Sequence, residues 1–226
     1  YAGSPYAYHT LGSCLAVQGE SYAQVRGFPR RSGGEDFYLL NKLVKTGDIA
    51  RLDGACIALR SRQSSRVPFG TGPAVADIVQ SGDPTRQEIF YHPQVFAALR
   101  ALLKAMPLLL DKPDGKLREI LVEQQLVPAL ALRTVSELDA MGLNSALAHC
   151  RRQGKDQAQR MRHFHQWFDG FRTLKFIHAL SNRGWPRLSL TQLVATDPQL
   201  WPSEKSNGTN IETLRCAIRD HWQWQD

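Results

Sequence analysis

The sequence predicts an α+β fold that is mostly α, with a short α/β region ahead of a longer helical region. Three observations predict it. Residues 1–85 are rich in Gly, Ser and Pro and carry only short apolar runs. Residues 86–226 show mainly helical periodicity. A turn-rich stretch at 81–87 separates them, so we expect two parts, residues 1–85 and residues 86–226.

The first part is predicted to run strand, helix, strand. Residues 13–18 (SCLAVQ) and 49–62 (IARLDGACIALRSR) have the length and the bounding residues of strands. Between them, apolar residues recur at helical spacing from residue 35 up to Gly47, which is a natural helix stop. This order of elements is typical of part of an α/β sheet.

The second part contains most of the predicted helix. Four stretches are predicted to be helical: 86–110, 115–142, 145–184 and 210–222. We expect an interruption at Pro93, an end near Pro107 and a kink or break at Pro128, because proline cannot donate within a helix. The stretch 145–184 is expected to hold two helices, the second of which ends at 182–184.

Composition limits the class of protein. The formal charge of +7 and the pI of about 9.4 favour anionic partners. No nucleic-acid motif accompanies this charge, so nucleic acid is not an expected partner. The four cysteines form no CxxC pattern, so a metal cluster is not expected and a cytoplasmic location is predicted. No apolar run approaches the roughly 20 residues of a membrane-spanning helix. The opening at Tyr1 reads as mid-domain chain, so we expect a piece of a longer protein.

A pair of acids, Glu35 and Asp36, follows Gly33 and Gly34 at the start of the first predicted helix. Glycine permits backbone conformations that other residues avoid and lets a ligand approach closely. A helix start also stabilises negative charge, because its N–H groups lack partners within the helix. The pair is therefore either a simple helix cap or a site where carboxylates act on a ligand, and these residues alone leave both readings open.

A row of arginines follows the second predicted strand. If residues 60–66 are extended, Arg60, Arg62 and Arg66 point to one face of the strand. Three guanidinium groups in line could hold a diphosphate through charge-assisted hydrogen bonds. The alternative is a solvated face of an edge strand, whose charges oppose pairing with another strand.

Three sequence elements follow one another in a fixed order: GSCLAV at 12–17, a YxxVxGF turn at 22–28 and GED at 34–36. Over residues 9–75, this order resembles the acceptor-side half of inverting glycosyltransferases of the GT-A fold and the family-two type. The resemblance implies that the first part is a fragment of a GT-A α/β domain and the second an α-helical extension. It also implies transfer of a sugar from a nucleotide-sugar donor to an acceptor hydroxyl with inversion.

The resemblance implies a role for each residue of the acidic motif. Asp36 would be the general base that takes the proton from the acceptor hydroxyl, and Glu35, next to Gly34, would hydrogen-bond the acceptor sugar. The row of three arginines would help to hold the departing nucleoside diphosphate, a role inferred from charge and spacing alone. The expected partners are a nucleotide-sugar donor and a sugar or lipid-linked acceptor.

The sequence departs from the family in one respect. The nucleotide-binding half of such enzymes carries an Asp-x-Asp motif that holds a divalent metal, and no Asp-x-Asp occurs here. We therefore expect Mg²⁺ or Mn²⁺ only in a full-length parent, no metal site in this fragment, and no activity of the fragment alone. His92 is the nearest candidate for a histidine ligand used by many relatives, and a packing or capping role is its alternative.

The helical part carries no motif of known chemistry. Its basic segment, residues 149–165, is either a solvated helix face or a surface that docks on an acidic membrane, which would make the protein membrane-peripheral. A second function therefore stays open: a helical protein-interaction module whose α/β part is a non-catalytic scaffold.

Overall fold

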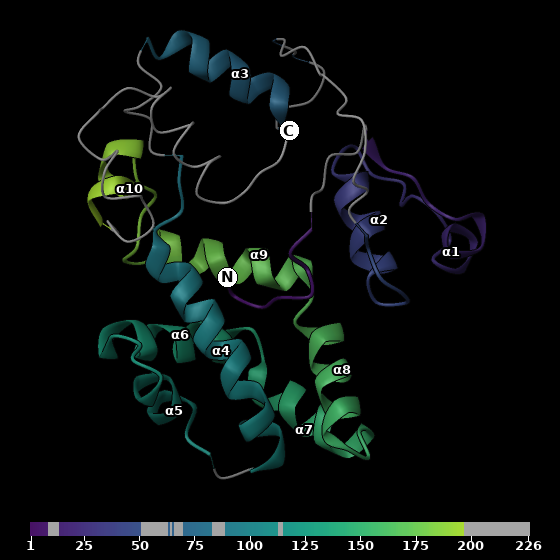
Figure 1. Ribbon diagram of the computed structural model, residues 1–226, viewed down its shortest axis with the longest axis vertical. Coiled ribbons are helices and arrows are strands. Elements are labelled where there is room, and N and C mark those ends of the chain that lie inside the picture. The colour runs from purple at the N-terminus through teal and green to yellow at the C-terminus, as the bar shows by residue number, and fades with distance from the viewer. Residues whose placement is uncertain are drawn as a thin grey trace. The chain divides into compact units, whose positions relative to one another are not determined.

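The computed structural model describes residues 1–8, 14–50, 63, 65, 70–82, 89–112 and 115–196 (Figure 1). The chain divides into two compact units. Unit 1 joins Tyr1–Leu52 to Gln94–Gly184, and unit 2 joins Asp53–Pro93 to Trp185–Asp226. The predicted division at residue 85 falls among residues 83–88, which lie outside the described residues, and it stays a prediction.

The described residues contain ten α-helices. Those of unit 1 are α1 (Gly19–Gln24), α2 (Glu35–Leu43), α4 (Pro93–Asp111), α5 (Leu117–Glu123), α6 (Pro128–Ala140), α7 (Leu143–Gln153), α8 (Gln157–Trp167) and α9 (Gly170–Asn182). Those of unit 2 are α3 (Thr71–Gln80) and α10 (Leu190–Thr196). Unit 2 also has an isolated antiparallel bridge between Phe90 and Leu188.

The predicted α+β fold is wrong for the part of the chain that the structure describes. That part is mostly helical and contains no β-strand, so no α/β domain of the GT-A type is seen. Residues 15–18, which were expected to be extended in a strand, run as irregular chain into α1. There the Gln18 carbonyl accepts a hydrogen bond from the Tyr22 N–H at 2.9 Å. The second expected strand, 49–62, lies almost entirely outside the described residues.

The alternation of apolar residues that suggested the first strand reflects burial of one side of the chain and not hydrogen bonding to another strand. Leu15 and Val17 pack against a small core, whereas Ala16 between them is exposed. A strand is completed by hydrogen bonds to a neighbouring strand, and no such neighbour exists among residues 1–8 and 14–50. Alternating apolar residues can thus bury one side of an irregular segment without forming a sheet.

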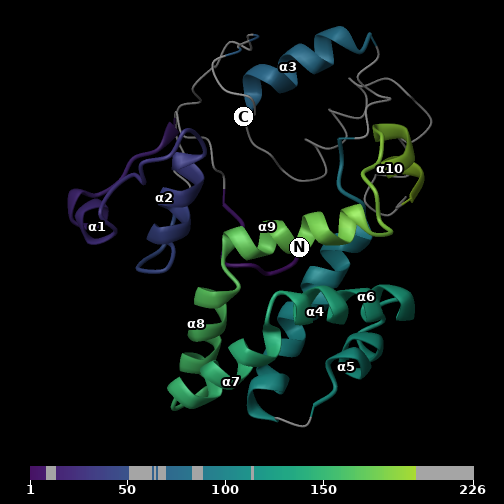
Figure 2. The same cartoon turned by 180° about the vertical axis from the view of Figure 1, so that it is seen from behind.

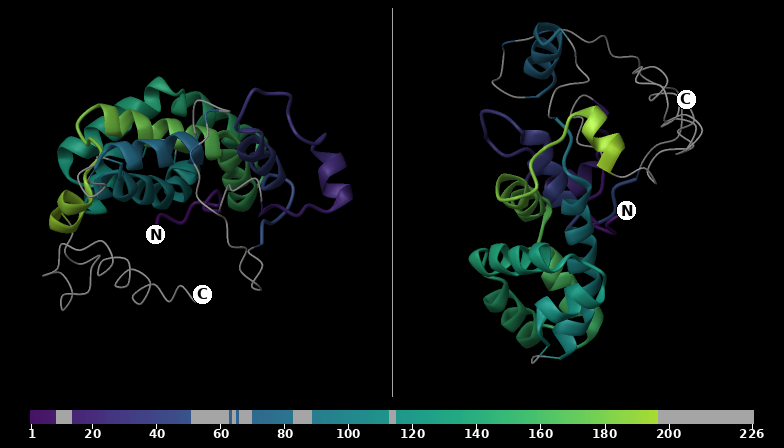
Figure 3. Two further views of the ribbon diagram at one scale, coloured as in Figure 1. Left: turned by 90° about the horizontal axis from the view of Figure 1, so that it is seen from above. Right: turned by 90° about the vertical axis from the view of Figure 1, so that its left-hand side faces the viewer.

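The core of unit 1 is built around α4. Ten of its 19 residues are buried, among them Leu102 and Met106, whose exposed fraction is 0%. Helices α5 and α6 contact each other, and α6 also contacts α7 and α9. Figures 2 and 3 show these teal and green helices lying beside α4.

By length and composition α4 is also long and apolar enough to cross a membrane, with a mean hydropathy of 1.3. The expectation that no apolar run approaches the length of a membrane-spanning helix is therefore wrong for this helix. Half of the helix is buried against the rest of the protein. This burial is typical of the central helix of a folded domain, whose apolar face is covered by other helices.

Helix α4 continues through Pro107, where an end was predicted, and stops at Asp111. A proline inside a helix withholds its own N–H and crowds the carbonyl four residues earlier, so the helix end that follows it needs other support. Guanidinium groups from two other helices bind the last carbonyls of α4. Arg151 donates from Nη2 to the Leu109 carbonyl, and Arg160 donates from Nη1 to the Leu110 carbonyl at 3.5 Å. These donors satisfy groups that a helix end leaves without partners.

The other predicted helix boundaries are partly confirmed. Pro128 is the first residue of α6 and separates it from α5, as expected of a proline at that position. The last helix in the stretch 145–184 ends at Asn182, as predicted. The stretch contains parts of three helices, however, where two were expected. Asp156 and Asp169 create the extra starts, because each carboxylate caps the third residue of the following helix. The predicted helix 210–222 lies outside the described residues.

We predict that Leu102→Ala lowers the free energy of unfolding by about 2–5 kcal/mol, because it leaves a cavity at the centre of α4. The matched control is Leu108→Ala on the same helix, whose side chain is 52% exposed. This control should change stability by less than about 0.5 kcal/mol. Urea unfolding of both variants measures the difference, and equal losses would show that α4 is not the core helix.

Candidate functional site

The acidic motif lies at the start of α2, as predicted. Gly34 is the residue before the helix and has a left-handed backbone, with φ 71° and ψ 17°. Glu35 is exposed and Asp36 is half-buried, and both lie in the first turn. The Phe37 N–H donates to Asp36 Oδ1 at 2.7 Å. A left-handed glycine at this point turns the chain sharply, so both carboxylates leave from one helix end.

The turn before α2 is held against the side of that helix. Lys42 of α2 donates from Nζ to the Val25 carbonyl at 2.5 Å and to the Gly27 carbonyl at 2.8 Å. Gly27 has a φ of +60°, and a Cβ placed there would lie 2.7 Å from the Tyr22 ring. The Tyr22 hydroxyl accepts from the Phe28 N–H at 3.3 Å. Tyr22, Gly27 and Phe28 thus pack together, and Lys42 joins this turn to α2.

A small apolar core supports this unit. Val25 of the turn is buried together with Leu39, Leu40 and Leu43, which lie on one side of α2. Helical spacing places these three leucines on the same face, although the periodicity had predicted Phe37, Leu40, Leu43 and Val44 as the apolar stripe and so missed Leu39. The first turn of α2 is therefore fixed by the burial of the turns that follow it.

Two aromatic rings, one from α2 and one from α9, lie in contact with each other and each also contacts a cation. The guanidinium carbon of Arg31 lies 3.9 Å from the centre of the Tyr38 ring. The Tyr38 ring lies 5.9 Å from that of Phe171 on α9, and Lys175 Nζ lies 4.6 Å from the Phe171 ring. Such contacts are each worth about 0.5–1 kcal/mol at exposed positions. They add a second attachment between α2 and α9.

A buried carboxylate, Asp169, also attaches α9 to α2. Asp169, Asn41 and Lys45 together are called the Asp169 latch. Asp169 Oδ2 accepts from Lys45 Nζ at 2.6 Å and from Asn41 Nδ2 at 3.0 Å. The Asn41 amide oxygen accepts in turn from the Gly170 N–H at 2.9 Å. Asn41 and Asp169 are only 6% and 8% exposed. A buried carboxylate needs such partners, because it has lost its hydration.

The pKa of Asp169 follows from these contacts. Burial raises it, but the hydrogen bonds from Lys45, from the Arg172 N–H and from Asn41 outweigh burial, so the pKa is lowered. The latch is consequently charged at neutral pH. Its negative charge is then balanced by the Lys45 ammonium in a partly buried ion pair.

Two tyrosines cover the latch. The Tyr6 hydroxyl donates to the His165 carbonyl at 2.5 Å, and the Tyr6 ring lies where a side chain at Gly170 would need space. Burial, with a further contribution from the charge of Asp169, raises the pKa of Tyr8 to about 12 and also raises that of Tyr6. Both hydroxyls therefore remain protonated at neutral pH.

Three of the six predicted site residues lie in the part of the chain that the structure describes. Gly34, Glu35 and Asp36 lie side by side at the start of α2. Arg60, Arg62 and Arg66 lie outside the described residues, so the diphosphate grip stays a prediction. The roles assigned to the acids also stay predictions.

The residues of the latch were missed by sequence reasoning. Asn41 and Lys45 lie four residues apart on one face of the predicted helix, which is a signal for a shared contact. Asp169 precedes an apolar periodic run and could have been identified as a helix cap. Neither signal reveals that the two contacts meet, since 128 residues separate Asn41 from Asp169.

The basic segment 149–165 is partly internal. Arg151 and Arg160 bind the end of α4, and Arg160 also pairs with Asp111 at 3.2 Å. Arg152 and Arg162 are exposed. The surface charge of this segment is therefore smaller than its sequence suggests, and its docking on an acidic membrane stays a prediction.

A metal site is not found in the described part of the chain. No three His, Cys, Asp or Glu side chains there are arranged to hold a metal ion. His92, the candidate ligand, is half-buried just before α4, where burial lowers its pKa. Mg²⁺ or Mn²⁺ was expected only in a full-length parent, so that expectation stays a prediction.

Comparison with known proteins gives no relative: no protein-family model, no curated protein and no solved structure matches this chain.

We predict that Gly27→Ala destabilises the protein by about 1–3 kcal/mol, because the new methyl group meets the Tyr22 ring in a backbone conformation that alanine avoids. Gly142→Ala is the matched control, with a φ of +86° but no atom within 4 Å of the added Cβ. This variant should lose only about 1 kcal/mol of stability, the cost of placing alanine in a left-handed backbone conformation. Urea unfolding distinguishes the two, and a loss at Gly27 no larger than that at Gly142 would contradict the packing described for the turn.

We predict that Asp169→Asn destabilises the protein at pH 7 by about 2–3 kcal/mol, because Lys45 and Asn41 lose a charged acceptor. The folded pKa of Asp169 is lowered, so its contribution is present above the unfolded pKa near 4 and is lost as pH falls through the folded value. The difference between wild type and variant should therefore shrink between pH 7 and pH 3.

The control for the latch is Asp111→Asn, which removes an ion pair whose acid is 44% exposed. We expect a loss below about 1 kcal/mol at pH 7. Urea unfolding at both pH values measures each variant. A difference for Asp169→Asn that is the same at pH 3 as at pH 7 would mean that its charge does not hold α2.

Proposed function

We propose that this chain forms the acceptor side of an inverting, nucleotide-sugar-dependent glycosyltransferase, with Asp36 as the general base. The observation that carries the proposal is the placement of Glu35 and Asp36 in the first turn of α2, directly after the left-handed Gly34. The proposal rests on this site and on the motif order at 12–36, and not on the fold class.

General-base catalysis of sugar transfer needs a carboxylate that is held in place and is accessible to the acceptor. Asp36 is half-buried, so part of this residue is exposed to solvent. The acceptor oxygen would form a bond to the anomeric carbon as the bond to the nucleoside diphosphate breaks on the opposite face. This displacement inverts the configuration of the anomeric carbon, and Asp36 would take the proton from the attacking oxygen.

Glu35 is placed to orient the acceptor. It is exposed and adjacent to Asp36, so its carboxylate can accept a hydrogen bond from a second sugar hydroxyl. The attachments of α2 to the turn and to α9 would hold both acids in one geometry. Positioning of this kind lowers the entropic cost of bringing reactants together.

A second candidate function is a helical protein-interaction module. The observation that favours it is that three large apolar side chains between residues 122 and 132 are exposed: Val122 of α5 at 40%, Val127 just before α6 at 52% and Leu132 of α6 at 55%. Contact sites are often rich in exposed apolar groups. Under this function, Leu132→Gln would weaken self-association or partner binding, and substitutions at Asp36 would have no effect on it.

We predict that Asp36→Asn lowers sugar transfer by about 10²-fold or more, because the amide keeps the shape but cannot accept the proton. Transfer is measured with the full-length protein, a panel of nucleotide sugars and added Mg²⁺ or Mn²⁺. Glu35→Gln should mainly raise KM for the acceptor. Asp48→Asn, at an exposed position of the same region, is the control and should change nothing. Full transfer by Asp36→Asn would refute the proposed base.

A further inference from the structure

The guanidinium group of Arg31 lies beside the acidic motif and is held there by an aromatic ring. Its central carbon lies 3.9 Å from the centre of the Tyr38 ring. The Tyr38 ring in turn lies against Gly34, because a Cβ placed on that glycine would be 4.0 Å from Tyr38 Cε2. Helical spacing also places Glu35 and Tyr38 on the same face of α2. The cation therefore lies at the end of α2 that carries the two acids.

The ring that holds Arg31 is itself fixed by other rings. The Tyr38 ring packs edge-to-face against Phe37, with 5.3 Å between the ring centres, and lies 5.9 Å from the Phe171 ring of α9. A long arginine side chain normally samples many rotamers, and a ligand that orders it must offset the lost entropy. Because Arg31 already rests on a fixed ring, less of this entropy remains to be lost when a ligand binds.

The hydrogen-bond donors of Arg31 remain available to a ligand. Arg31 is exposed and makes no hydrogen bond or ion pair with any residue that the structure describes. Glu35 makes none within the same part of the chain, so the nearest acid does not neutralise this cation. A guanidinium group is planar, and its five N–H donors point outward in that plane. Stacking on a ring covers a face of the plane and leaves its edge free to bind a carboxylate or a phosphate through two parallel hydrogen bonds.

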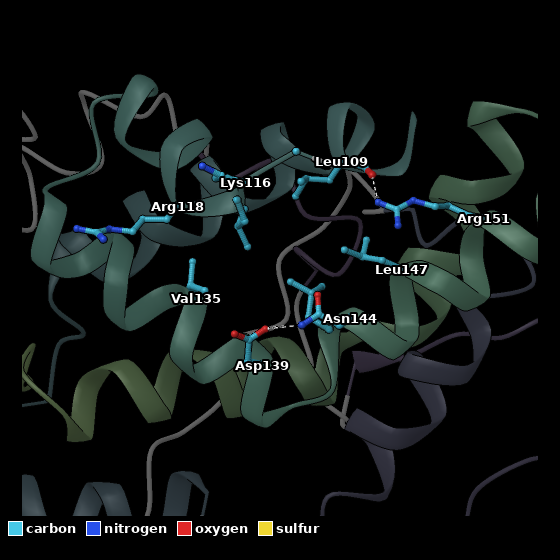
Figure 4. A pocket seen from close by; sticks show the side chains of 11 residues that line it. Leu109, Lys116, Arg118, Val135, Asp139, Asn144, Leu147 and Arg151 are labelled. Carbon is cyan, nitrogen blue, oxygen red and sulfur yellow. Dashed lines mark hydrogen bonds between the residues drawn. The ribbon is translucent and has the colours of Figure 1, made fainter. Parts of the chain in front are cut away.

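The arginines at the other end of unit 1 are arranged differently. A cavity of about 310 Å³ between α4, α5, α6 and α7 is lined by two of them, and Figure 4 shows Arg118 and Arg151 at opposite sides of it. Arg151 already donates from Nη2 to the Leu109 carbonyl. The cations of this cavity therefore do not converge on one anion, whereas Arg31 can bind one through a single oriented guanidinium group.

The position of Arg31 indicates which part of the substrate it faces. In an inverting transfer the diphosphate leaves from the side of the sugar opposite the attacking acceptor. An arginine at the same helix end as the proposed base Asp36 therefore lies on the side of the acceptor. An anionic acceptor placed next to Glu35 and Asp36 would be repelled by both carboxylates, and a cation beside them offsets that repulsion.

We propose that Arg31 selects an acceptor sugar that carries an oxyanion, either a carboxylate or a phosphate, near the hydroxyl that reacts. This inference rests on the proposed function, because it takes the acidic motif as the place where the acceptor binds. Arg31 binds the anionic group, Glu35 a neighbouring hydroxyl and Asp36 the hydroxyl that reacts. Arg31 thus determines specificity and takes no part in proton transfer.

The test is an NMR titration of the whole chain with three sugars that share one pyranose ring. Methyl β-D-glucuronide carries a carboxylate, glucose 6-phosphate carries a phosphate, and methyl β-D-glucoside is the neutral counterpart. We expect at least one anionic sugar to bind about tenfold or more tightly than the neutral sugar, and Arg31→Gln to remove that preference. Arg31→Gln loses only a ring contact of an exposed side chain, so it is expected to fold, which thermal unfolding verifies.

Arg30→Gln is the matched control. Arg30 is the neighbouring exposed arginine, and it contacts no aromatic ring among the described residues, so this variant should keep the preference for an anionic sugar. Equal binding of the charged and neutral sugars by the wild type would overturn the proposal. An undiminished preference in Arg31→Gln would overturn it as well.

A further titration with uridine diphosphate separates the acceptor from the leaving group. If Arg31→Gln weakens binding of uridine diphosphate and leaves binding of the sugars unchanged, Arg31 holds the donor and the acceptor role is refuted. The readout is binding and not transfer. Full transfer by Asp36→Asn would therefore refute the proposed base and leave the sugar preference standing, so the two failures can be told apart.

Discussion

The geometry of unit 1 depends on one buried carboxylate. Asp169 accepts hydrogen bonds from Asn41 and Lys45, residues that lie 128 and 124 positions away in the chain. Removing a charge from water is costly, and close, well-directed partners must offset that cost. Because α2 can satisfy Asp169 only in one position along α9, the latch fixes where the first turn of α2, and with it the acidic motif, must lie.

Buried polar groups also need partners at the C-terminal end of α4. Its last carbonyls would be left without partners if the helix ended alone, and Arg151 and Arg160 supply the donors. These arginines come from the segment that looks most like a charged surface in the sequence. Two of the five lysines and arginines of this segment are therefore used inside the unit, and net charge overstates what the segment offers to a partner.

Local signals in the sequence predicted local structure well. Helix α2, the break at Pro128 and the end at Asn182 follow from periodicity, proline and helix-stop residues, which act over a few residues. The strand at 13–18 was wrong because a strand is completed by a partner elsewhere in the chain. The end near Pro107 was wrong because distant guanidinium groups stabilise the following turn. The acidic motif could be located from sequence, whereas the latch that positions it could not.

The discontinuous make-up of unit 1 has a practical consequence for anyone expressing parts of this protein. A truncation that begins in the turn-rich stretch 81–87 would keep Asp169 and remove both Asn41 and Lys45. The helical piece would then expose an unpaired acid and the surface that Tyr6 covers. Soluble, well-behaved fragments should therefore come from boundaries that retain residues 1–52 along with the helices, even though the two segments are far apart in the chain.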